Sequence, residues 1–147
     1  MSHIARVEIV VTSLDDLDAA CQRLGLRLNR GQTTYKWWGE SAGDTPLPEG
    51  MTVDDLGKCS HAICIPGNKD AYEIGVVKRP NGQGFTLAWD YFQGGYGLQD
   101  VCGSDCNKLK QAYAVEAAKR TAQLEGFTVQ EFANQDGSVR LQLTGGF

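Results

Sequence analysis

The chain has 147 residues and a net charge of -4, with 41% hydrophobic and 22% charged residues. This composition is typical of one globular domain and excludes a disordered chain. The acidic balance argues against binding to a nucleic-acid polymer, since neutralising phosphates supplies most of that affinity. Apolar runs such as residues 9–11 are too short to cross a membrane, and no secretion signal opens the chain. An odd number of cysteines, five, favours reduced thiols, so we expect a cytoplasmic protein.

The first 25 residues predict a strand followed by a helix. Apolar and polar residues alternate over residues 4–11, which indicates a strand with one buried face. Ser13 and Asp16 match a capping box, in which the hydroxyl and the carboxylate both accept from amide groups at a helix start. Apolar residues then recur at helical spacing, and Gly25 is placed to end the helix. These helix residues are Leu14, Leu17, Cys21 and Leu24.

The middle of the chain predicts short strands separated by loops. Residues 26–38 form an extended segment that is interrupted near Arg30 and Gly31. Residues 39–57 are rich in Gly, Pro, Ser, Thr and acids, which indicates a long loop. The sequence "RPNGQG" at 79–84 predicts a hairpin turn. The three strands expected in this part span residues 62–65, 72–78 and 85–89.

The last part predicts a second helix and a hairpin. Ser104 or Asp105 caps a helix over about residues 107–125, and Gly126 ends it. Its expected buried stripe consists of Leu109, Ala112, Tyr113, Ala117 and Leu124. Residues 127–132 and 138–143 flank the turn "NQDG" and close the chain as a hairpin. The predicted fold is a single α+β domain over residues 1–147, with a mostly antiparallel sheet and two helices on one face.

Two segments carry a resemblance to a known family. "MSHIARVEIVVTSLDDLDAACQRLG" (1–25) and "LKQAYAVEAAKRTAQLEGFTVQEFANQDGSVRLQL" (109–143) resemble the hypothetical chloroplast open reading frame thirty-five family. That family is a domain of unknown function found in plastids, cyanobacteria, other bacteria and phages. Residues 30–104 differ from its plastid members. The resemblance implies the same α+β fold and a bacterial or phage origin, hence the cytosol of a bacterium or infected host, and it carries over no catalytic residue.

An aromatic and glycine-rich stretch, "TLAWDYFQGGYG" (86–97), is the best candidate for a binding surface. Residues 86–91 are expected to form a strand with Leu87 and Trp89 on one face. Residues 93–103 should form a loop, because three glycines there permit positive φ. This loop should carry Tyr96 toward a cleft shared with residues 37–38 and the 39–57 loop.

The predicted ligand site combines aromatic rings with basic side chains. The residues assigned to it are Trp37, Trp38, Tyr91, Tyr96, Lys36 and Arg79, with Lys78 and Arg30 as further cations. Adjacent residues on a strand face opposite ways, so one ring of each neighbouring pair should be exposed. Exposed rings mark binding surfaces, and a cation beside them can hold a phosphate. The alternative is that these rings are core residues of a small sheet.

Cysteine and histidine provide weak candidates for a metal site. Cys59, His61 and Cys64 lie close together in "CSHAIC", and Cys102 and Cys106 add two soft ligands. Their spacing is not that of a zinc ribbon or finger, and buried cysteine is common in cores. No motif of a known catalytic class is present. We therefore expect no cofactor and no catalytic residue.

Three functions remain open from the sequence. The first is a non-enzymatic protein that binds, and plausibly sequesters, a small anionic, nucleotide-like phosphorylated ligand. The second is an assembly protein that forms homo-oligomers through exposed aromatic residues. The third is a metal-dependent enzyme that uses the cysteines and His61.

Overall fold

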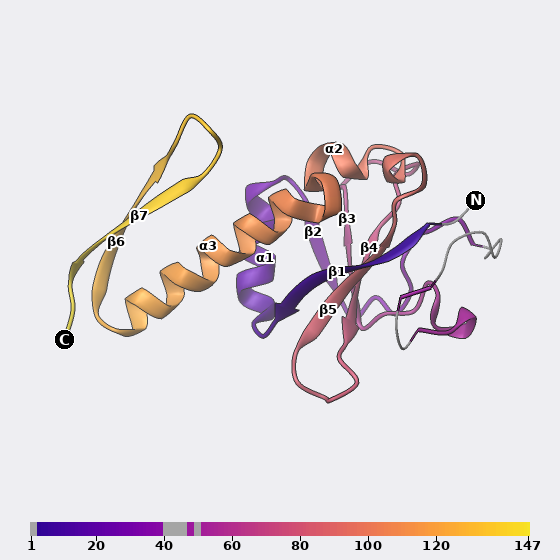
Figure 1. The fold of residues 1–147 in the computed structure, drawn as a ribbon, viewed down its shortest axis with the longest axis horizontal. Coiled ribbons are helices and arrows are strands. Elements are labelled where there is room, and N and C mark those ends of the chain that lie inside the picture. Colours follow the sequence, from indigo (N-terminus) through magenta and orange to yellow (C-terminus); the bar gives the residue numbers. More distant parts are fainter. Residues whose placement is uncertain (1–2, 40–46, 49–50) are drawn as a thin grey trace.

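The computed structural model describes residues 3–39, 47–48 and 51–147. Figure 1 shows a sheet, helices packed beside it, and a hairpin that projects from the far end of the longest helix. The main sheet has the strand order β1-β5-β4-β3-β2, and every neighbouring pair is antiparallel. Its strands are β1 (Ile4–Val11), β2 (Arg27–Arg30), β3 (His61–Cys64), β4 (Ile74–Lys78) and β5 (Phe85–Asp90).

Two helices cover one face of this sheet. They are α1 (Leu14–Arg23) and α3 (Asn107–Leu124), which pack against each other. Alternate strand residues such as Val7, Ile74 and Leu87 face them and form the main core with Trp89, as predicted for that strand. The predicted α+β class is thus confirmed. Within the described residues, no helix is both long and apolar enough to cross a membrane.

The start of α1 fulfils half of the predicted capping box. The Ser13 hydroxyl accepts from the backbone N–H of Asp16 at 3.1 Å, and Gly25 follows the helix with φ +74°. The Asp16 carboxylate instead lies 3.4 Å from Nε of Arg120, and the Ser13 N–H donates to the Tyr113 hydroxyl. The reciprocal bond is absent because α3 packs against this end of α1 and supplies both partners.

Three predictions about the segment before and along α3 are wrong. Residues 93–103 contain a short helix, α2 (Leu98–Cys102), where a loop was expected. Neither Ser104 nor Asp105 caps α3, because the N-cap is Cys106, which has φ 55° and makes no side-chain capping bond. Leu124 does not extend the buried stripe and is 74% exposed, because the end of α3 extends beyond the sheet.

The C-terminal hairpin forms a sheet of its own. Strands β6 (Phe127–Ala133) and β7 (Val139–Gly145) pair antiparallel without interruption of the register. The hairpin prediction is confirmed, but neither strand joins the main sheet. Side chains of α1 and α3 attach the hairpin to the rest of the chain. Both carboxylate oxygens of Glu131 on β6 accept hydrogen bonds from the guanidinium of Arg23 on α1, and the Nε of Arg23 lies 2.5 Å from the carboxylate of Glu116 on α3.

Candidate functional site

The second face of the main sheet is only partly covered. Tyr35 packs on it against Ala62 and Ala88, with Trp37 and Met51 beside them. This cover comes from the extended segment after β2, where Thr34 bridges to Lys58. Much of the predicted 39–57 loop lies outside the described residues. The described residues leave another part of this sheet face uncovered.

A hollow of about 310 Å³ lies on this open part, and we call it the basic hollow. Arg6 and Thr86 belong to the floor, since Arg6 stands opposite Ala88 and Thr86 opposite Val77 across the strands. The lining residues are Arg6, Met51, Asp55, Lys58, Cys59, Ser60, Val77, Lys78, Pro80, Thr86 and Ala88. The hollow is therefore lined by three cations, Arg6, Lys58 and Lys78, together with apolar residues.

The three cations of the basic hollow form no ion pair within 4.0 Å with a described carboxylate. None of the ion pairs within 4.0 Å there involves Arg6, Lys58 or Lys78. Asp55 is the one described carboxylate in the lining, and it accepts two hydrogen bonds from Thr52. Those bonds, helped by Lys58, lower the pKa of Asp55. The described lining of the hollow therefore carries an excess of positive charge.

A second hollow of about 540 Å³ adjoins the first and shares Arg6, Pro80 and Thr86 with it. Glu8 and Arg79 are among its lining residues. Arg79 lies in the turn between β4 and β5, where its N–H donates to the Gly84 carbonyl. The predicted phosphate ligands Lys78 and Arg79 thus stand beside these hollows, at the opposite end of β5 from Tyr91.

The predicted aromatic surface exists at the other end of β5. Trp38, Tyr91 and Tyr96 are 45%, 39% and 42% exposed. Phe92 joins two of them, since its ring centroid lies 5.5 Å from that of Trp38 and 6.3 Å from that of Tyr96. His3 contacts both Tyr91 and Phe92. We call the four residues Trp38, Tyr91, Phe92 and Tyr96 the aromatic cluster.

The buried carboxylate of Asp90 organises the aromatic cluster. It accepts from the backbone N–H groups of His3 at 2.8 Å, Trp38 at 3.0 Å and Phe92 at 3.0 Å. These donors come from three separate segments of the chain. Such bonds satisfy a buried charge that would otherwise be costly. Asp90 therefore fixes where the exposed rings stand, a role that the sequence did not reveal.

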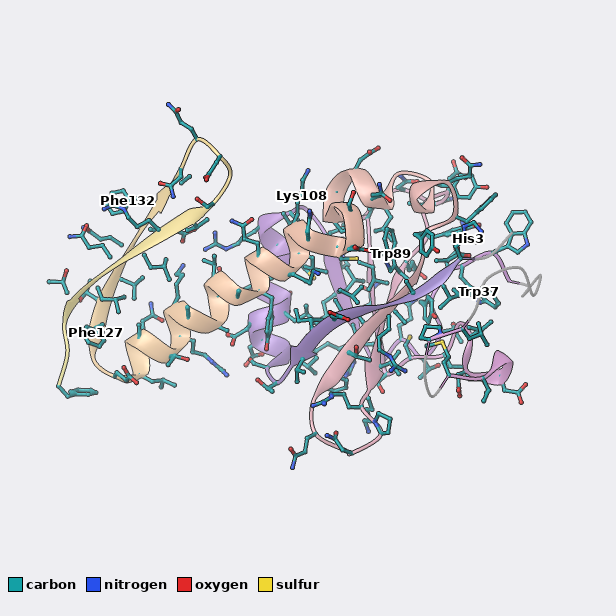
Figure 2. All side chains as sticks on the ribbon, viewed as in Figure 1. His3, Trp37, Trp89, Lys108, Phe127 and Phe132 are labelled. Atoms are coloured by element: carbon teal, nitrogen blue, oxygen red, sulfur yellow. The ribbon has the colours of Figure 1, made fainter. Side chains whose placement is uncertain are left out.

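The remaining predicted ligand residues at this end of the sheet, Trp37 and Lys36, are held by other contacts. Trp37 packs beside Tyr35 and fills the space in which a Cβ on Gly57 would stand, whereas Trp38 contacts Phe92. In Figure 2, Trp37 and His3 lie at the same end of the sheet. The Nζ of Lys36 donates to the Lys69 carbonyl. Arg6 and Lys58 were not among the predicted ligand residues, although the alternation in β1 places Arg6 on the face opposite the helices.

The candidate metal ligands do not gather. Among the described residues, no group of three or more His, Cys, Asp or Glu side chains could hold a metal ion. Cys59 donates to the Gln32 carbonyl at 3.2 Å, while Nδ1 of His61 accepts from the Gly31 N–H at 2.9 Å. Cys64 lies 3.4 Å from the Asn29 amide. Cys102 and Cys106 are buried in the main core beside α2 and α3.

Comparison with known proteins identifies a family but no activity. No curated protein and no solved structure matches this chain. A family model described as "Protein of unknown function (DUF1257)" matches residues 50–142. The match includes much of the middle region as well as α3 and most of the hairpin. Because it covers more than half of the 147 residues, the chain belongs to this family of proteins of unknown function.

Proposed function

We propose that this protein binds a small anionic molecule in the basic hollow, with phosphorylated, nucleotide-like compounds as the preferred class. The observation that carries the proposal is that Arg6, Lys58 and Lys78 line one hollow and form no ion pair with a described carboxylate, on a chain of net charge -4. Like charges held close together repel unless an anion neutralises them. A bound anion would remove this repulsion.

The shape and chemistry of the hollow suit such a ligand. Its volume lies near the lower end of the range of about 300–1,000 Å³ seen for small-molecule sites. Arg6 can bind a phosphate or carboxylate with two parallel hydrogen bonds, and the two lysines act as point charges. Val77 and Ala88 supply an apolar floor for an uncharged part of the ligand.

The lining favours binding over catalysis. Nucleophilic cysteine must be a thiolate, but burial raises the pKa of Cys59 to about 11. Its thiol therefore stays protonated at neutral pH. Ser60 also lines the hollow, but a serine nucleophile needs a base beside it. The neighbouring His61 is not among the lining residues, and its Nδ1 already accepts a hydrogen bond from the Gly31 N–H. We accordingly propose a non-enzymatic binder from a bacterium or phage, related to the chloroplast open reading frame family.

Calorimetric titration tests this proposal. The ligands are pyrophosphate, ADP, ADP-ribose and a cyclic nucleotide, with uncharged adenosine as the control. We expect at least one anion to bind, and Arg6→Gln or Lys58→Gln to weaken it by about tenfold or more, equal to about 1.4 kcal/mol. Arg27→Gln, an exposed cation of β2 outside the hollow, should bind normally. Silence across the panel, or equal affinity in all variants, would refute the proposal.

A second candidate is self-association through the aromatic cluster. Trp38, Tyr91 and Tyr96 are exposed together, which is typical of interface residues. If they form an interface, Trp38→Ala and Tyr96→Ala should each lower the molar mass measured by light scattering. An unchanged mass would exclude this candidate.

A further inference from the structure

The C-terminal hairpin has little support from the rest of the chain. Isolated two-stranded hairpins are at best marginally stable in water. Polar contacts attach this one to the body, including Lys119 to Glu131 at 3.3 Å and Gln111 to the Gly137 carbonyl at 2.8 Å. A hollow of about 710 Å³ lies between its tip and the helices α1 and α3. Figure 2 shows Phe127 and Phe132 at the end of the molecule away from Trp37.

The outer edges of the main sheet are protected against pairing with another strand. The edge strand β1 carries Arg6 and Glu8, and its register shifts between Val7 and Val11. The other edge strand, β2, has four residues and carries two arginines. Charges, irregularities and short length are the usual devices that keep sheet edges from associating.

The edge of β7 has less of this protection. β7 has seven residues in regular register with β6, contains no proline, and carries one charge, Arg140. Leu143 on this strand is 46% exposed. The edge of β6 is less free, because β6 follows α3 after two residues and its Glu131 is held by Arg23. Among the strands that the structure describes, β7 therefore has the least protected edge.

We propose that β7 pairs antiparallel with β7 of a second copy of this chain, so that two hairpins form one four-stranded sheet. The sequence of β7 is self-complementary about Gln142. In that register Leu141 stands opposite the partner subunit's Leu143, and Arg140 stands opposite the partner subunit's Thr144. No like charges meet, and apolar residues face each other on one side of the sheet. The added strands stabilise a hairpin that is marginal alone.

Charge substitution at the centre of this pairing provides the test. Gln142→Lys places two cations directly opposite each other, and Gln142→Glu places two anions there, both of which destabilise strand pairing. Gln130→Lys is the matched control, because Gln130 pairs with Gln142 inside the hairpin but lies on β6. Circular dichroism checks that each variant is folded.

Sedimentation equilibrium at micromolar concentrations gives the outcome. We expect wild type and Gln130→Lys to dimerise, and each Gln142 variant alone to dimerise at least about tenfold more weakly. An equimolar mixture of the Lys and Glu variants should recover the dimer. A monomeric wild type, an equal loss in Gln130→Lys, or no recovery in the mixture would each overturn the proposal. The basic hollow lies on the main sheet and not on the hairpin, so anion binding by the Gln142 variants can be measured independently of dimerisation.

Discussion

The ring of Tyr35 occupies the space in which a Cβ on Gly75 would stand. Such an atom would overlap Cδ1 and Cε1 of the ring, and both residues are buried. This contact brings the segment after β2 onto the open face of the sheet beside Ala62 and Ala88. The absence of a side chain at position 75 therefore helps to form the cover next to the basic hollow.

Gly75→Ala should destabilise the protein by about 1–3 kcal/mol, because overpacking forces the Tyr35 ring to move. Gly75 does not have a positive φ, so the effect comes from the contact alone. Urea unfolding measures the change. In a Tyr35→Leu background the same substitution should cost less, and fully additive effects in the double variant would contradict the packing argument.

Tyr35→Phe should leave stability unchanged or slightly raised. The Tyr35 hydroxyl is buried near the Gly57 backbone, yet it makes no hydrogen bond of normal geometry among the described residues. Burial also raises its pKa to about 12. Tyr113→Phe is the comparison, since its hydroxyl accepts from the Thr12 N–H at 3.0 Å, and it should cost about 1 kcal/mol. An equal loss in both variants would contradict this expectation.

Asp90→Asn should cost roughly 1–3 kcal/mol, because the new amide group faces a buried backbone donor that the carboxylate had satisfied. Those donors are the N–H groups of His3, Trp38 and Phe92. Thermal and urea unfolding would measure the loss, with the exposed Asp100→Asn as control. Trp38 fluorescence should shift as well, and a variant as stable as wild type would show that Asp90 does not organise the aromatic cluster.

The attachment of the hairpin should weaken at low pH. Hydrogen bonds from Arg23, with help from Lys119, lower the pKa of Glu131 to about 2 from its ordinary value of 4.5. A lowered pKa stabilises the folded state above the ordinary value, so this contribution disappears as pH falls from 4.5 toward about 2. Hydrogen exchange of the β6 amides should report the change. Glu131→Gln should exchange faster already at neutral pH and lose this dependence.

The sequence predicted elements whose signals are local. Alternation around Val7 predicted β1, and Ser13 predicted the start of α1. Residues 98–102 were expected to continue the glycine-rich loop but form α2, because the chain turns into a helix after Gln93 and Tyr96 adopt left-handed backbone conformations, which non-glycine residues seldom do. The side chains of these two residues do not indicate a left-handed conformation, because tertiary contacts impose it.

Of the candidate site, the sequence predicted the exposed aromatic rings but not the basic hollow. Trp38 and Tyr96 were predicted to be exposed because they are large aromatic residues near glycines, and both are exposed. The basic hollow was not predicted, because Arg6, Lys58 and Lys78 come from separate segments. Their meeting depends on the pairing of β1 with β5 and of β5 with β4, and that register cannot be derived from the spacing of charges.

The most direct test of the proposed function is a titration of the isotopically labelled protein with ADP, followed by amide chemical shifts. Binding in the basic hollow predicts the largest saturable shifts at Lys58, Ser60, Val77, Lys78 and Thr86. Arg6→Gln should need at least about tenfold more ADP for the same shifts, and added salt should weaken the binding further, since screening weakens charge interactions. Shifts concentrated on Trp38, Tyr91 and Tyr96 would place the ligand on the aromatic cluster instead and contradict the proposal, as would a titration with no shifts.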